Sequence, residues 1–112
     1  MPVSVDPRSF TEPSEDHPHV SSLTALVGGR WTSTVSIDTG EGVRELLRRA
    51  FDTGDFAADY SEAERWEKRT AEAIRACCYP ALNAAWFARL EPRTPEFQVA
   101  YLAVPATLRR AA

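Results

Sequence analysis

The segment around Gly28-Gly29 constrains the fold more than any other part of the chain. Residues 30–37 alternate between apolar and polar side chains, and residues 23–27 alternate in the same way. Strict alternation is typical of half-buried strands, and two glycines between such runs suit a tight turn because both can adopt positive φ. The sequence therefore predicts a β-hairpin. The expected inward-facing side chains of its second strand are Trp31, Val35 and Ile37.

A helix is predicted over residues 39–53. Asp38-Thr39-Gly40-Glu41 has the spacing of a capping box, in which the first carboxylate accepts from an early N–H and Glu41 reaches back. Gly54 suits the left-handed position that follows a helix. The apolar residues fall at i, i+3, i+4, i+7 and i+8, the spacing of an amphipathic helix, and they are Val43, Leu46, Leu47, Ala50 and Phe51.

A second capping box, Ser61 to Glu64, predicts a longer helix that runs to Tyr79. Glu64 and Lys68 form an i,i+4 pair on one of its sides. Pro80 either kinks this helix or stops it, and the apolar phase continues beyond the proline, which favours a kink. The expected buried side consists of Trp66, Thr70, Ala73, Ile74 and Cys77.

Residues 97–104 are apolar at nearly every position, which predicts a strand covered on both faces. The expected fold class is α+β with the order β-β-α-α-β. It has a three-stranded antiparallel sheet with two helices on one face, the second of them kinked at Pro80. The competing interpretation is a mostly helical protein.

The chain has 112 residues, which is enough for one domain. We expect that domain over residues 20–105, between a flexible, proline-rich arm at 1–19 and a short tail at 106–112. The first segment has too few apolar residues to order itself alone.

The charge pattern argues against nonspecific binding to nucleic acid or to an anionic membrane, because the net charge is −3. No apolar run approaches the roughly 18 residues that span a bilayer, and the N-terminus lacks a signal-peptide pattern. These features predict a cytoplasmic protein. The dominance of arginine over lysine is expected of a bacterial genome rich in GC.

Cys77 and Cys78 are adjacent, so a disulfide between them would be strained. We interpret them as reduced thiols that pack in the core, because free cysteine behaves as a small hydrophobic residue. Their sequence alone does not decide whether they also have a redox role.

No motif in the sequence indicates catalysis, a cofactor or a metal. The cluster Glu15, Asp16, His17 and His19 lies in the proline-rich arm without a framework to hold ligand geometry. The spacing of Asp52, Asp55 and Asp59 does not match a calcium loop. The two histidines are also the only ones in the chain, which leaves the predicted domain without a histidine base for nucleophilic catalysis. We therefore expect neither metal nor cofactor and lean against an enzyme.

The first functional hypothesis is a small regulatory or accessory protein that binds a protein partner or self-associates through an apolar surface. Residues 81–90 are apolar almost all round a helix, which indicates an interface in so small a domain. The flexible arm and the sheet edge over residues 20–37 are further candidate surfaces. The expected interface residues are Trp86, Phe87 and Leu90, with Phe10 as an anchor in the arm.

Two alternatives come from other functional classes. One is a small-molecule pocket or enzyme between the sheet and the helices, lined by Trp31, Tyr60, Trp66, Tyr79 and Tyr101. The other is a nucleic-acid-binding regulator that uses the predicted helix at 39–53. That helix carries Arg44, Arg48 and Arg49, but interleaved acidic residues bring it close to neutral and make this alternative the weaker one.

Overall fold

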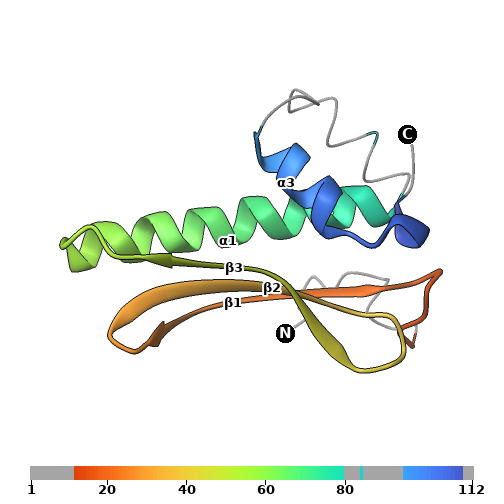
Figure 1. Ribbon diagram of the computed structural model, residues 1–112, viewed down its shortest axis with the longest axis horizontal. Coiled ribbons are helices and arrows are strands. Elements are labelled where there is room, and N and C mark those ends of the chain that lie inside the picture. The colour runs from red at the N-terminus through yellow and green to blue at the C-terminus, as the bar shows by residue number, and fades with distance from the viewer. Residues whose placement is uncertain (1–11, 80–83, 85–94, 110–112) are drawn as a thin grey trace, which may run out of the picture.

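The computed structural model describes residues 12–79, 84 and 95–109, and these form an α+β domain with the element order β-β-β-α-α. The elements are β1 (His19–Val27), β2 (Arg30–Asp38), β3 (Val43–Phe51), α1 (Phe56–Cys78), α3 (Pro95–Ala103) and the 3₁₀ turn η2 (Ala106–Leu108). The strands form one antiparallel sheet in the order β1-β2-β3. Helix α1 lies along one face of the sheet, and α3 packs on the side of α1 away from the sheet (Figure 1). The predicted class is confirmed, but the predicted order is wrong.

The predicted hairpin is present as β1 and β2. Val27 pairs with Arg30 across a two-residue turn in which Gly28 and Gly29 have φ of 59° and 79°. Positive φ at both positions is what a type I′ turn requires, and its twist matches the strands that it joins. The expected alternation is also confirmed, because Val35 and Ile37 are fully buried beneath α1.

The predicted helix over residues 39–53 is wrong, because this segment forms β3. Asp38 Oδ1 accepts hydrogen bonds from the N–H groups of Gly40 (2.8 Å) and Gly42 (3.2 Å), so the supposed helix cap shapes the turn between β2 and β3. The pairing of β2 with β3 shifts register between Val35 and Ser36. A bulge of this kind breaks the two-residue alternation, which is why the apolar spacing resembles that of a helix.

The predicted second helix is present as α1, but its limits differ. It begins at Phe56, where Asp55 Oδ1 accepts from the N–H of Ala58 at 3.1 Å, so the Ser61 to Glu64 box lies inside the helix. It ends at Cys78, and Tyr79 is extended with φ −125° and ψ 112°. The expected kinked continuation is therefore wrong, because the residue before a proline is driven out of the helical region. Pro80 itself lies outside the described residues.

The predicted strand over residues 97–104 is also wrong, because α3 occupies Pro95–Ala103. Ala100 and Val104 are buried, whereas Leu102 is 74% exposed, so the buried positions follow helical spacing. A short run that is apolar at nearly every position does not distinguish a buried strand from a helix, and a proline at its start favours the helix.

The core is centred on the C-terminal half of α1, which the sheet covers on one side and α3 on another. It includes Val35 and Ile37 from β2, Ile74 and both cysteines from α1, and further side chains from α3 and η2. Cys77 and Cys78 are buried free thiols, as expected for core packing. Leu108, which falls in the predicted tail, is buried in the same cluster.

Residues 12–18 of the predicted arm run against the domain. The Tyr79 hydroxyl donates to the carbonyl of Pro18 at 2.5 Å, and Pro18 is buried. The backbone of Pro13 lies beside Gly40 in the turn between β2 and β3. These contacts join residues 12–18 to the end of α1 and to the turn between β2 and β3. No helix in the described part of the chain is long and apolar enough to cross a membrane.

Candidate functional site

The two flanks of α1 carry different chemistry. The side of α1 that faces the sheet has small or apolar residues such as Ala63, Thr70 and Ile74, which let the helix approach the strands closely. One flank, toward β1, carries Glu67 and Tyr60, and the other, toward β3, carries Trp66. Each flank contains a candidate site.

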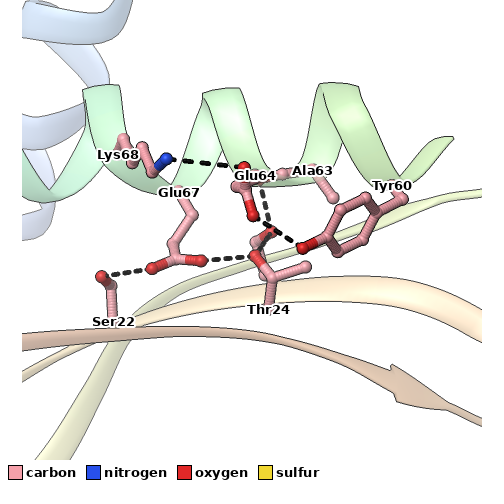
Figure 2. A network of polar contacts seen from close by, with 8 residues as sticks. Ser22, Thr24, Tyr60, Ala63, Glu64, Glu67 and Lys68 are labelled. Carbon is pink, nitrogen blue, oxygen red and sulfur yellow. Dashed lines mark hydrogen bonds and ion pairs between the residues drawn. The ribbon is translucent and has the colours of Figure 1, made fainter. Parts of the chain in front are cut away.

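A polar network joins α1 to the sheet (Figure 2). Glu67 accepts hydrogen bonds from the hydroxyls of Ser22 and Thr24, both at 2.6 Å. Thr24 also lies 2.8 Å from Ser33, whose hydroxyl donates to the carbonyl of Ala63 at 2.7 Å. These contacts join β1 and β2 to α1, so the network positions the helix on the sheet.

An apolar patch lies beside this network, at the hairpin end of β1 and β2. We call it the aromatic patch and define it by Leu26, Trp31, Phe56 and Tyr60. The Trp31 ring lies 5.2 Å from Phe56 and 4.7 Å from Tyr60, between ring centroids. Leu26 pairs with Trp31 across the strands, which places both side chains on one face of the sheet. The exposed fractions are 61% for Phe56, 48% for Leu26 and 41% for Tyr60, so the aromatic patch faces solvent.

The rim of the aromatic patch is polar. The Tyr60 hydroxyl donates to Glu64 at 2.7 Å, and Lys68 lies 3.4 Å from the same carboxylate. The hydrogen bond from Tyr60, reinforced by the charge of Lys68, lowers the pKa of Glu64. The same hydrogen bond and the negative charge of Glu64 raise the pKa of Tyr60. These contacts fix the Tyr60 ring with its hydroxyl directed along the helix.

A pocket of about 150 Å³ lies on the opposite flank of α1, against β3. We call it the arginine pocket, and its lining residues are Arg49, Phe51, Glu62, Arg65, Trp66 and Arg69. The guanidinium carbon of Arg49 lies 4.7 Å from the centre of the Phe51 ring, and Phe51 makes an edge contact with Trp66 at 6.3 Å. Arg65 donates to Glu62 at 3.0 Å. The lining therefore combines three arginines and one glutamate with two aromatic side chains.

The structure does not bring the five predicted pocket residues together. Trp31 and Tyr60 lie in the aromatic patch, whereas Trp66 lies in the arginine pocket. Tyr79 lies at the far end of α1, about 28 Å from Tyr60 along the helix axis at 1.5 Å per residue. Tyr101 stacks with Arg109 at 4.6 Å. The aromatic residues therefore contribute to separate surfaces.

The predicted interface residues Trp86, Phe87, Leu90 and Phe10 lie outside the described residues. The segment expected to act as a recognition helix is β3, and Arg48 on it pairs with Glu45 at 2.9 Å.

The acidic residues that suggest a calcium loop have structural partners. Asp55 caps α1, and Asp59 is buried and accepts from both the N–H and the hydroxyl of Thr53. Asp52 lies 3.4 Å from Arg30. Across residues 12–79, 84 and 95–109, no three His, Cys, Asp or Glu side chains come together in a way that could hold a metal ion.

Sequence reasoning names Trp31, Tyr60 and Trp66 but misses the other residues that complete the two surfaces. The capping box at Ser61 places the start of the helix there, which leaves Phe56 outside it. The predicted helix at 39–53 places Arg49 on a helix face rather than on a strand opposite Ser33. The i,i+4 spacing of Arg65 and Arg69 is a signal that places both on one side of the helix, but it does not show which strand they face.

Comparisons of the chain with protein-family models, with curated proteins and with solved structures found no match.

Proposed function

We propose that this chain is a small interaction protein of the regulatory or accessory type. It binds another protein through the aromatic patch and performs no catalysis itself. The observation that carries the proposal is Phe56, a phenylalanine that is 61% exposed although its ring contacts that of Trp31. Contiguous exposed apolar side chains on a soluble domain mark interaction sites more often than scattered ones do.

The composition of the aromatic patch suits a binding surface. Tryptophan and tyrosine dominate the binding energy of protein interfaces because they bury a large area with few rotatable bonds. Trp31 lies on a strand and Tyr60 on the first turns of α1, so neither depends on a loop for its position. A partner with an apolar side chain of its own would cover Phe56 and Leu26 without rearranging the domain.

The aromatic patch also contains a buried polar group that lowers the stability of the isolated domain. The indole N–H of Trp31 is buried and has no acceptor among the described residues. An unsatisfied buried donor costs about 1–3 kcal/mol. A site that keeps such a donor beside exposed aromatic rings is better explained by binding than by stability.

The test compares the full chain with two variants, F56D and V43D. Phe56 is in the aromatic patch, whereas Val43 is 71% exposed at the start of β3 and outside it, so V43D is a matched control for charge and solubility. Binding is measured by affinity capture from the native host and by light scattering after size exclusion. Urea titration establishes that each variant is folded.

We expect one protein, or a second copy of this chain, to bind the wild type and V43D but not F56D. Binding that survives F56D would overturn the proposal, as would a chain that remains monomeric and captures nothing. Trp86, Phe87, Leu90 and Phe10 remain proposed interface residues. The proposal for the aromatic patch does not depend on them.

A small-molecule binding function is the second candidate. The observation that favours it is the arginine pocket, which has an aromatic base and an excess of positive charge.

A further inference from the structure

The arginine pocket carries a local charge opposite to that of the chain. Its lining contributes three guanidinium groups and one carboxylate, whereas the net charge of the chain is −3. Arg65 and Arg69 lie one turn apart on α1. Arg49 pairs with Ser33 across β2 and β3, and the side chains of such partners point to the same face of the sheet. Because Ser33 is buried beneath α1, Arg49 also faces the helix. The positive groups therefore converge from two elements on one cavity, which selects for an anion.

The volume of the arginine pocket and its two aromatic side chains restrict the kind of anion that it can bind. A volume of about 150 Å³ is well above the roughly 10–15 Å³ that a cavity needs to hold one water, so a single acidic group with a short organic part fits. Trp66 is half-buried and Phe51 is buried, so they form an apolar base beneath the charged rim. The arrangement suits an organic anion with its charged group toward the arginines.

We propose that the arginine pocket binds a phosphate monoester. A carboxylate presents two oxygens in one plane, whereas the terminal phosphate of a monoester presents three oxygens in a tetrahedral arrangement. Three guanidinium groups from a strand and two helical turns can each donate to a different oxygen of such a group. The dianion of a monoester at neutral pH also complements a lining that holds three arginines and one glutamate.

A phosphodiester of a nucleic-acid backbone is the poorer match. It carries one charge and exposes two unesterified oxygens, so it leaves one guanidinium without an oxygen. The pocket is also a compact hollow lined by six residues rather than a groove that follows a strand of phosphates. The proposal is independent of the aromatic patch, because the two sites share no residue.

The test is a titration of the full chain with methyl phosphate, phenyl phosphate and dimethyl phosphate at pH 7.5 and constant ionic strength. Binding is followed by the chemical shifts of the Trp66 indole and of the arginine side-chain N–H groups. We expect saturable shifts with methyl phosphate and tighter binding of phenyl phosphate, whose ring can contact Trp66. Dimethyl phosphate, which mimics the diester, is expected to bind at least about tenfold more weakly, the effect of losing one charge-assisted hydrogen bond.

Three variants assign the binding to the arginine pocket. R69Q is expected to weaken binding of methyl phosphate about tenfold, because it removes one charge-assisted donor. R44Q removes the same charge from β3 outside the pocket and is expected to leave the affinity within about twofold. E62Q is expected to strengthen binding, because it removes the one carboxylate from the lining and releases Arg65 from its hydrogen bond.

The proposal would be overturned by shifts that do not saturate. A loss of affinity in R44Q equal to that in R69Q would also overturn it, since that would indicate a general charge effect. Binding of dimethyl phosphate as tight as that of methyl phosphate would exclude the monoester as the specific ligand. None of these outcomes bears on the aromatic patch, whose test uses other residues.

Discussion

Ser33 on β2 donates a hydrogen bond of 2.7 Å to the backbone carbonyl of Ala63 on α1, and its side chain is fully buried. This bond joins the centre of the sheet to the helix at a point where the layer between them is polar. A buried hydroxyl that bonds to a helix carbonyl fixes the position of the helix more strictly than apolar contacts do.

We expect S33A to destabilise the domain by about 1–2 kcal/mol, because Ala63 and Thr24 each lose a hydrogen-bond contact in a buried layer. Ser36 lies on the same strand and is only half-buried, so S36A is the matched control and should change stability by less than about 0.5 kcal/mol. Urea denaturation measures the change in the free energy of unfolding for S33A and for S36A. Equal effects of the two variants would show that the bond between Ser33 and Ala63 is not stabilising.

The network around Glu67 predicts a difference between two substitutions of that residue. Four contacts link Ser22, Glu67, Thr24, Ser33 and the carbonyl of Ala63, but the hydroxyls supply only three protons. The amide of glutamine has a similar shape and supplies a further proton toward Thr24. We expect E67A to cost about 1–3 kcal/mol, because two hydroxyls lose their acceptor.

E67Q should cost at least about 1 kcal/mol less than E67A in the same urea titration, because it retains the contacts to both hydroxyls. Nuclear magnetic resonance of the side-chain amide that E67Q introduces would show the new donor directly. If E67Q and E67A are equally unstable, the charge of the carboxylate rather than the number of donors stabilises the network.

The stability of the domain should fall at high pH because of Cys77. Burial of the thiol raises its pKa from 9.0 to about 11, an effect that Arg109 partly offsets. The unfolded chain therefore loses this proton at lower pH than the folded chain does. The contribution of the buried Cys77 thiol to the free energy of unfolding is fully present below pH 9 and is lost as the pH rises toward 11.

The measurement is the free energy of unfolding between pH 8 and 11, with C77A as the control that lacks the thiol. Wild type should lose more stability than C77A over this range. The same burial predicts that Cys77 reacts slowly with iodoacetamide in the folded state at neutral pH. Parallel pH profiles for the two proteins would contradict the prediction.

Two glycines in the turn between β2 and β3 test how residues 12–18 contact the domain. Gly40 and Gly42 have φ of 103° and 99°, so alanine is strained at both. A Cβ at Gly40 would also lie 2.9 Å from the carbonyl oxygen of Pro13, whereas one at Gly42 would meet nothing within 4 Å.

We therefore expect G40A to be the more destabilising of the two, by about 1 kcal/mol, and to increase amide exchange over residues 12–18. G42A should leave that exchange unchanged. Equal exchange in both variants would show that Pro13 moves aside without disturbing the segment.

The two candidate surfaces depend on contacts between distant segments. The sequence indicates Trp31, Tyr60 and Trp66 as aromatic residues of interest, but it does not separate them from Tyr79. Tyr79 is separated from Tyr60 because the two residues lie at opposite ends of α1. The arginine pocket could not be predicted, because Arg49 faces α1 only once its segment is a strand of this sheet.

The sequence by itself determined the hairpin of β1 and β2 and the existence of α1. Both depend on local physics, namely the positive φ of Gly28 and Gly29 and the helical spacing of the side chains that α1 buries. Only the tertiary structure decided β3 and α3. The apolar spacing of residues 43–51 fits a helix, but β2 needs a second partner along its other edge, and pairing with it outweighs local propensity. The apolar run of α3 became a helix because it packs on α1 rather than in the sheet.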